Sequence, residues 1–200
     1  MFRGSLKRGK MKLAPLAVTL SIGLLLVVSA NAQESKPADT AASTTPVTNP
    51  VSSTVKQQLT RFSKNMIAAA EAMPAEKYNF KPTPEMNTFA HLTIHIAQAN
   101  MHLCSKISGT AAPEAAKLTE ADGKDKLVTG LKVSFDFCST VLAGVDDSKL
   151  SDPMTLFGSF PSSRAGALIA LSDGFSDHYG AQAIYLRLSG ILPPTAKPKQ

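Results

Sequence analysis

Two histidines in separate segments are the residues of this chain best suited to metal or ligand chemistry. His95 lies in the segment FAHLTIHIA, and His178 lies in the segment SDHYGAQ. Neutral imidazole is a common ligand for divalent transition metals. At the helical period, His178 falls on the apolar side of its segment, where a ring nitrogen needs a partner. The pair predicts a metal or small-molecule site between two helices. The alternative for His178 is a core histidine bonded to Tyr185 or Gln182.

Other ionisable residues lie close to these two in the sequence. His91 precedes His95 by one helical turn, and this spacing would allow both rings to bind one ion. His102 lies roughly 10 Å further along the same helix, so we expect it to be a solvated rim residue. Asp173 and Asp177 should lie at the side of their helix, away from His178, as solvated carboxylates.

Cys104 and Cys138 are the two cysteines of the chain. In an exported protein an even count favours a disulfide, and the alternative is a pair of buried free thiols. Neither cysteine has an evident basic neighbour that would lower its pKa, so a nucleophilic role is disfavoured.

Four amphipathic segments of helical period must position these side chains, and no strand alternation is convincing. The segments are residues 53–73, 85–108 or 88–108, 122–145 and 161–189. Gly109 and Gly190 mark two helix ends, and Ser162 or Ser163 is suited to cap the last helix. The pattern predicts an all-α protein with the fold of a four-helix bundle.

The depths of the paired residues predict the order of the helices. Cys104 and Cys138 lie at similar distances from the starts of their helices, so they are level only if those helices are parallel. His95 lies as far from the end of its helix as His178 lies from the start of its own, which requires antiparallel helices. An up-down-down-up bundle with a long crossover between helices 2 and 3 satisfies both conditions. A simple up-down-up-down order would offset each pair by roughly 10–15 Å.

The N-terminal residues 1–32 have the pattern of an export signal peptide. Five basic residues precede an apolar run over 13–28, and Ala30-Asn31-Ala32 is a small-x-small cleavage site. We expect cleavage after Ala32, a periplasmic or secreted location, and no stable membrane anchor after cleavage. A retained anchor is the alternative. Residues 33–50 should be a flexible linker rich in Ser, Thr, Pro and Ala, residues 51–195 the bundle, and residues 196–200 a disordered tail.

The basic character of the chain comes from its N-terminus. The sequence has 21 Lys and Arg against 15 Asp and Glu, and residues 1–32 hold five of the basic residues and none of the acidic ones. The remaining chain has 21 − 5 = 16 basic residues against 15 acidic residues. No clustered basic face is evident, so nucleic acid is not an expected partner.

Four stretches together resemble one known family. They are EAMPAEKYNFKPTPEM (71–86), HIAQAN (95–100), DHYG (177–180) and IYLRLSGILPP (184–194), and they resemble the DinB-like family of damage-inducible four-helix bundles. The resemblance implies a crossover between helices 2 and 3. It also implies a divalent-metal site of three histidines: one matches His95, another matches His178, and the third falls on Gly174.

The departure at Gly174 leaves two interpretations of the site. His91 or water could replace the missing ligand, so that His95, His178 and His91 hold a divalent metal of the Zn, Ni or Mn class. Alternatively, this chain is a non-catalytic binding or stress-related bundle that has lost the metal, and Gly174 leaves a gap opposite His95 that could hold a small molecule. Some DinB-like proteins resemble thiol-dependent transferases and many resemble homodimers. The resemblance does not say whether this chain is an enzyme.

Overall fold

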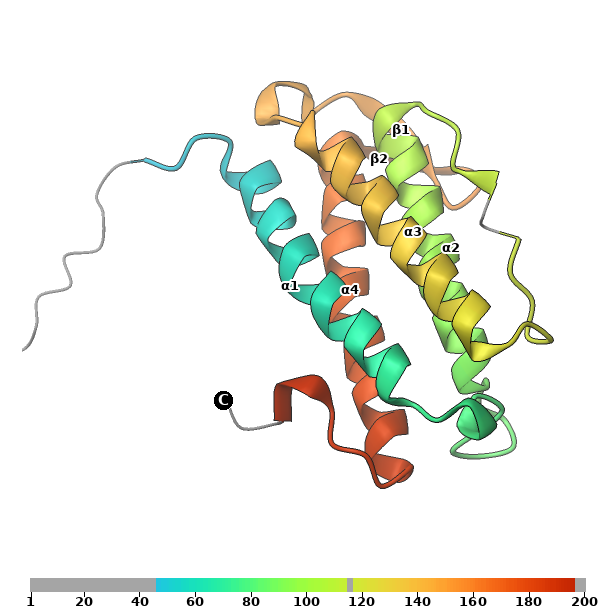
Figure 1. The fold of residues 1–200 in the computed structure, drawn as a ribbon. Coiled ribbons are helices and arrows are strands. Elements are labelled where there is room, and N and C mark those ends of the chain that lie inside the picture. Colours follow the sequence, from blue (N-terminus) through green and yellow to red (C-terminus); the bar gives the residue numbers. More distant parts are fainter. Residues whose placement is uncertain (1–45, 115–116, 197–200) are drawn as a thin grey trace, which may run out of the picture. The chain divides into compact units, whose positions relative to one another are not determined.

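The computed structural model describes residues 46–114 and 117–196, which fold into a bundle of four long helices (Figure 1). The helices are α1 (Pro50–Ala72), α2 (Phe89–Ser108), α3 (Lys124–Ala143) and α4 (Arg164–Leu188). This arrangement confirms the predicted all-α four-helix bundle. The predicted signal peptide, most of the linker and residues 197–200 lie outside the described residues.

Local capping explains where α2 and α4 begin and where α2 ends. The Thr88 hydroxyl accepts a hydrogen bond from the backbone N–H of His91, and the Ser163 hydroxyl accepts one from the N–H of Gly166. Both are side-chain N-caps of the ordinary kind. Gly109 follows α2 with a φ of 71°, a left-handed conformation in which glycine carries no steric cost. At α1, Pro50 occupies the first turn, and the helix begins three residues before the predicted start.

Contacts between α2 and its two neighbours fix their relative directions. Cys104 is bonded to Cys138, and one turn earlier Asn100 donates a hydrogen bond to Ser134, so α2 and α3 are parallel. The Arg164 guanidinium at the start of α4 donates to the Ile107 carbonyl at the end of α2 over 2.6 Å. Helices α2 and α4 are therefore antiparallel.

Helix α1 completes the up-down-down-up order. Lys56, near its start, donates to the carbonyl of Val145 just beyond α3, which makes α1 and α3 antiparallel. Phe62 stacks on Phe175 of α4, and further along Gln182 donates to the carbonyl of Met66, so α1 and α4 are parallel. The predicted crossover between helices 2 and 3 is confirmed, and it is formed by the connection from Gly109 to Gly123.

A short hairpin adds two strands where the sequence showed no convincing strand alternation. Strands β1 (Pro153–Leu156) and β2 (Phe160–Ser163) pair antiparallel, with Leu156 opposite Phe160. Each strand is only four residues long, too short for side-chain alternation to stand out from a loop. Phe157 and Gly158 form the turn with φ values of 47° and 89°. The hairpin occupies the connection before α4 and presents Phe157 beside the bundle.

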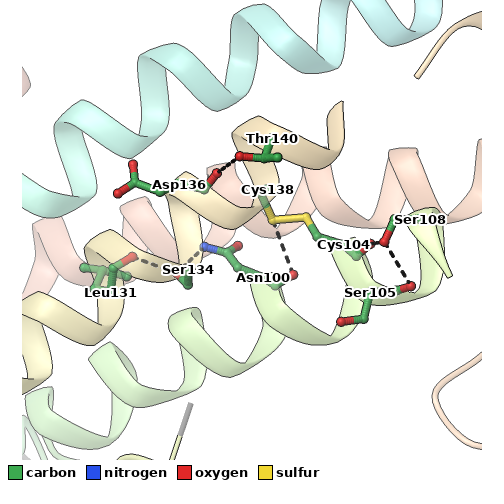
Figure 2. The surroundings of a disulfide bond; sticks show 9 residues. All are labelled: Asn100, Cys104, Ser105, Ser108, Leu131, Ser134, Asp136, Cys138 and Thr140. Atoms are coloured by element: carbon green, nitrogen blue, oxygen red, sulfur yellow. Dashed lines mark hydrogen bonds between the residues drawn. A yellow bond between two sulfur atoms is a disulfide. The ribbon is translucent and has the colours of Figure 1, made fainter. Parts of the chain in front are cut away.

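The core of the bundle is apolar and continuous through all four helices. The largest fully buried side chains include Phe89, Phe175, Met66, Ile107, Leu131 and Leu186. Cys104 and Cys138 form a disulfide within this core, with their Cα atoms 5.4 Å apart, which agrees with the first of the two cysteine alternatives (Figure 2). Among the described residues, no helix has the length and apolarity needed to cross a membrane.

Candidate ligand site between α2 and α4

His95 of α2 and His178 of α4 lie against each other across the helix interface. Their ring centroids are 4.9 Å apart, and the rings meet edge to face at 89°. His95 is exposed, whereas His178 is half-buried. The pair therefore lies in a surface groove between α2 and α4 and not in the core.

Neither of the two partners considered for a core His178 is directed at its ring. The Tyr185 hydroxyl donates to the carbonyl of Asn87 over 2.6 Å, and the Gln182 amide donates to the carbonyl of Met66 over 3.3 Å. Tyr185 thus joins α4 to the segment before α2, and Gln182 joins α4 to α1. The closest aromatic neighbour of the His178 ring is the ring of His95.

The surroundings of His178 favour its neutral form. Burial is the largest cause that lowers the pKa of His178, and the nearby His95 lowers it further, while Asp177 and Asp173 act in the opposite direction. A ring with a lowered pKa is unprotonated at neutral pH and retains a lone pair. That lone pair can accept a hydrogen bond or ligate a metal ion.

A pocket of about 330 Å³ opens beside the histidine pair, at the position of Gly174. A Cβ atom added at Gly174 would lie 3.5 Å from Cε1 of His178, in ordinary van der Waals contact. The glycine thus leaves the gap opposite His95 that the sequence predicted. Leu103 and Leu171 provide apolar walls, and Phe157 of the hairpin stands at the rim.

Asp173 and Asp177 line this same pocket, which differs from the prediction that they lie away from His178. Both are exposed, as predicted for solvated carboxylates. The pocket is a wide surface groove, so side chains on both flanks of α4 reach it together with His178. Helical angles alone missed this, because they give the direction of a side chain and not the width of the opening.

A second pocket, of about 350 Å³, lies on the other side of His95. Its lining residues come from the segment before α2, the first turns of α2 and the second half of α4. They include Glu85, Asn87, His91, Leu92 and Tyr185, in addition to His95. His95 therefore forms a wall shared by two pockets along one groove.

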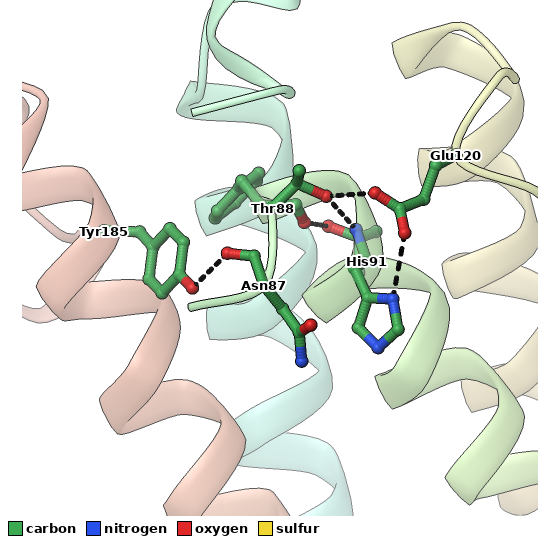
Figure 3. Close-up of polar contacts among 7 residues, drawn as sticks. Asn87, Thr88, His91, Glu120 and Tyr185 are labelled. Atoms are coloured by element: carbon green, nitrogen blue, oxygen red, sulfur yellow. Dashed lines mark hydrogen bonds and ion pairs between the residues drawn. The ribbon is translucent and has the colours of Figure 1, made fainter. Parts of the chain in front are cut away.

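His91 bonds away from the histidine pair. Its Nδ1 lies 3.0 Å from a carboxylate oxygen of Glu120, and the Thr88 hydroxyl donates to the other oxygen over 2.6 Å (Figure 3). Hydrogen bonds from Thr88 and then from His91 lower the pKa of Glu120. This network ties the start of α2 to the crossover that precedes α3. Sequence reasoning missed Glu120, because no local pattern fixes the path of a long loop.

His102 lies on the solvated rim, as predicted. It is exposed, and its ring stacks on that of Phe157 with centroids 6.1 Å apart. The contact joins α2 to the tip of the hairpin, whose Phe157 lines the first pocket.

The donor set matches two metal ligands and not three. Within residues 46–114 and 117–196, no three His, Cys, Asp or Glu side chains gather closely enough to form a metal-binding group. Catalytic zinc centres use three protein ligands plus a water, and structural centres use four. His95 and His178 therefore fit a site in which most coordination positions are filled from outside the chain.

Comparisons with known proteins identify the family and the fold. The DinB superfamily matches residues 58–172. Among solved structures, a DinB-like protein from Bacillus cereus has a TM-score of 0.58 and 17% identity, covering 70% of this chain and 93% of that one. A DinB-like protein from Bacillus subtilis has a TM-score of 0.58 and 18% identity, covering 73% and 99%. A conserved protein from Enterococcus faecalis has a TM-score of 0.55 and 20% identity, covering 68% and 94%. Among curated proteins, no match is found.

Proposed function

This chain belongs to the DinB superfamily, and we propose that it is an exported bundle that binds a divalent transition metal through His95 and His178. The observation that supports this is the meeting of the two rings across α2 and α4, with 4.9 Å between centroids. Imidazole nitrogen is a good ligand for zinc and nickel, and the lowered pKa of His178 keeps its lone pair free at neutral pH.

Two protein ligands make this a low-affinity site with open positions. Water or a small molecule in the adjoining pocket would complete the coordination, because the Gly174 position holds no side chain. A divalent ion held there would supply a Lewis acid to that molecule. The chain itself contributes the two imidazoles, the apolar walls of the pocket and the carboxylates of Asp173 and Asp177 at its edge.

Export is the second part of the proposal. It is supported by the signal-like pattern of residues 1–32 and by the pairing of Cys104 with Cys138, because disulfides persist mainly in oxidising compartments. Cell fractionation and N-terminal sequencing test it. We expect a periplasmic or secreted protein that begins at Gln33, and an uncleaved chain in the membrane fraction would contradict this.

Metal titration of the purified protein tests the site. We expect zinc or nickel to raise the melting temperature and to bind with one ion per chain, because an ion that binds only the folded state stabilises it. His95→Ala and His178→Ala should each abolish the effect. His102→Ala is the matched control, since it removes an exposed histidine of the same helix that lies outside the pair.

A bundle that binds its ligand without metal is the second candidate, and the observation that favours it is Gly174. The glycine occupies the position of an expected ligand and opens a pocket of about 330 Å³. If wild type and His102→Ala bind metal no better than His95→Ala, the metal proposal is wrong and this candidate stands.

A further inference from the structure

We propose that the groove between α2 and α4 binds a linear aliphatic polyamine, which lies across His95 with one ammonium group near Asp173 and Asp177 and another near Glu85. The inference rests on the proposed function in that it names a ligand class for the same groove, but it requires no metal. It follows from the length of the groove, the sign of its charges and the chemistry of its middle section.

The groove is elongated because its two pockets share one wall. The pocket at Gly174 and the pocket at Tyr185 have volumes of about 330 and 350 Å³, and His95 lines both. Asp177 and Tyr185 are eight residues apart on α4, which corresponds to about 12 Å along the helix, a span that an extended spermidine can cover. A compact ligand would occupy one pocket, whereas an extended chain can occupy both.

The charged side chains that line the groove have one sign. Asp173 and Asp177 line one pocket and Glu85 lines the other, and neither pocket is lined by lysine or arginine. A cleft lined by charges of one sign concentrates ligands of the opposite charge. Asp173 and Asp177 line the pocket on one side of His95 and Glu85 lines the pocket on the other, so they match a ligand with a cationic group at each end.

A different pocket of the bundle lacks this property. The pocket of about 380 Å³ near the ends of α2 and α3 is lined by Lys149 and Arg164 as well as by Asp146. A cationic ligand would be repelled by its two basic side chains. The sign of its lining therefore distinguishes that pocket from the α2–α4 groove.

The middle of the groove suits a methylene chain interrupted by an amine. Leu92 lines one pocket, and Leu103 and Leu171 line the other, so alkyl segments can pack on apolar walls as the stem of a lysine does. Between them lies the half-buried ring of His178. A neutral imidazole nitrogen can accept a hydrogen bond from a secondary ammonium group.

Isothermal titration of the oxidised chain, stripped of metal by chelating resin, tests the proposal with spermidine and the shorter 1,4-diaminobutane. We expect spermidine to bind about tenfold more tightly, because only the longer ligand reaches Glu85 and presents a secondary ammonium group to His178. Asp173→Asn together with Asp177→Asn should weaken both ligands about tenfold. Glu85→Gln should weaken spermidine about threefold and leave 1,4-diaminobutane unchanged, as expected for the loss of an exposed ion pair.

Asp136→Asn is the matched control, because Asp136 is an exposed carboxylate on α3 that lines neither pocket. The proposal is overturned if Asp136→Asn weakens spermidine as much as the double variant does, since binding would then reflect the general surface charge. It is also overturned if the double variant binds like wild type, or if trilysine binds more tightly than spermidine.

Variants of the two proposed metal ligands separate this proposal from the metal proposal. His95→Ala combined with His178→Ala removes both metal ligands but leaves all three carboxylates. Spermidine binding without any metal binding by wild type would refute the proposed function and support the polyamine site. Metal binding by wild type without spermidine binding would do the reverse.

Discussion

The two sides of α2 differ in how they meet their neighbours. On the α3 side, Cys104 is bonded to Cys138 and Asn100 donates to Ser134, and all four residues are buried. On the α4 side, less than three turns away, His95 is exposed and meets His178 in a groove flanked by two pockets. One helix thus forms a closed interface and an open one.

The difference suggests a division of roles. The α2–α3 interface has a covalent bond and a buried polar pair, which fix the position of one helix along the other. The α2–α4 interface leaves polar and ionisable groups facing solvent, where they can bind a ligand. The disulfide holds α2 from the side that faces α3, away from the open groove.

The largest expected effect is on the closed interface. Replacing both Cys104 and Cys138 by alanine should lower the free energy of unfolding by about 3–4 kcal/mol, since the bond closes a segment with a sequence separation of 34. Urea unfolding of the double variant and of the wild type measures this. Metal affinity at temperatures where the variant is folded should change little. A stability loss below about 1 kcal/mol would mean that packing alone holds the interface.

The next effect is a gain on the open interface. Gly174→His should tighten zinc binding at least tenfold, or about 1.4 kcal/mol, by adding a third imidazole one turn from His178. The added Cβ meets His178 at ordinary contact distance, so the helix can accept it. Gly180→His on the same helix, where a Cβ meets nothing within 4 Å, is the control and should leave affinity unchanged. Equal gains in both variants would disprove a specific pair site.

A smaller effect is expected at His91. Its contact with Glu120 joins two half-exposed side chains, so His91→Ala or Glu120→Gln should change stability by less than about 1 kcal/mol. Neither variant should alter metal affinity, because the His91 ring bonds away from the pair. Urea unfolding measures the stability, and titration calorimetry measures the metal affinity. A loss of metal binding in His91→Ala equal to that in His95→Ala would return His91 to the ligand set.

The smallest effect is a pH dependence of stability from His178. Its pKa is lower in the folded protein than the usual value near 6.5, so the unfolded chain binds more protons in this range. The contribution is therefore complete above about pH 6.5 and is lost as the pH falls through the folded pKa. Nuclear magnetic resonance titration should show that His95→Ala raises the pKa of His178. Unchanged titration would mean that burial alone is responsible.

Regular helices made much of this molecule predictable. Because the rise per residue is constant, the depths of two residue pairs sufficed to predict parallel α2 and α3 and antiparallel α2 and α4. Gly109 and Ser163 marked helix boundaries through local capping, which depends on few residues. The order of the helices thus followed from short-range rules once each residue pair was assumed to meet, and the structure shows both pairs in contact.

Most of the features that the sequence did not predict lie in the connections between the helices. The hairpin at 153–163 has strands too short for a pattern, and Phe157 adopts a left-handed conformation that its sequence does not favour. Glu120 meets His91 only because the crossover returns to the start of α2. Asp173 and Asp177 reach the pocket because the groove is open. The apolar pattern of a helix predicts which side chains are buried, but it does not predict which pocket an exposed side chain lines.

The parallel course of α2 and α3 has an electrostatic consequence. Each helix carries a macrodipole equivalent to roughly +0.5 charge at its N-terminus and −0.5 at its C-terminus, so the parallel pair doubles both. At the C-terminal ends, Arg164 donates to the carbonyl of Ile107, and Lys56 donates to that of Val145. At the N-terminal ends, Glu120 accepts from Thr88, and Asp125 lies in the first turn of α3. The crossover therefore places two positive helix ends side by side and two negative helix ends side by side. Side chains of opposite charge lie at each of these places.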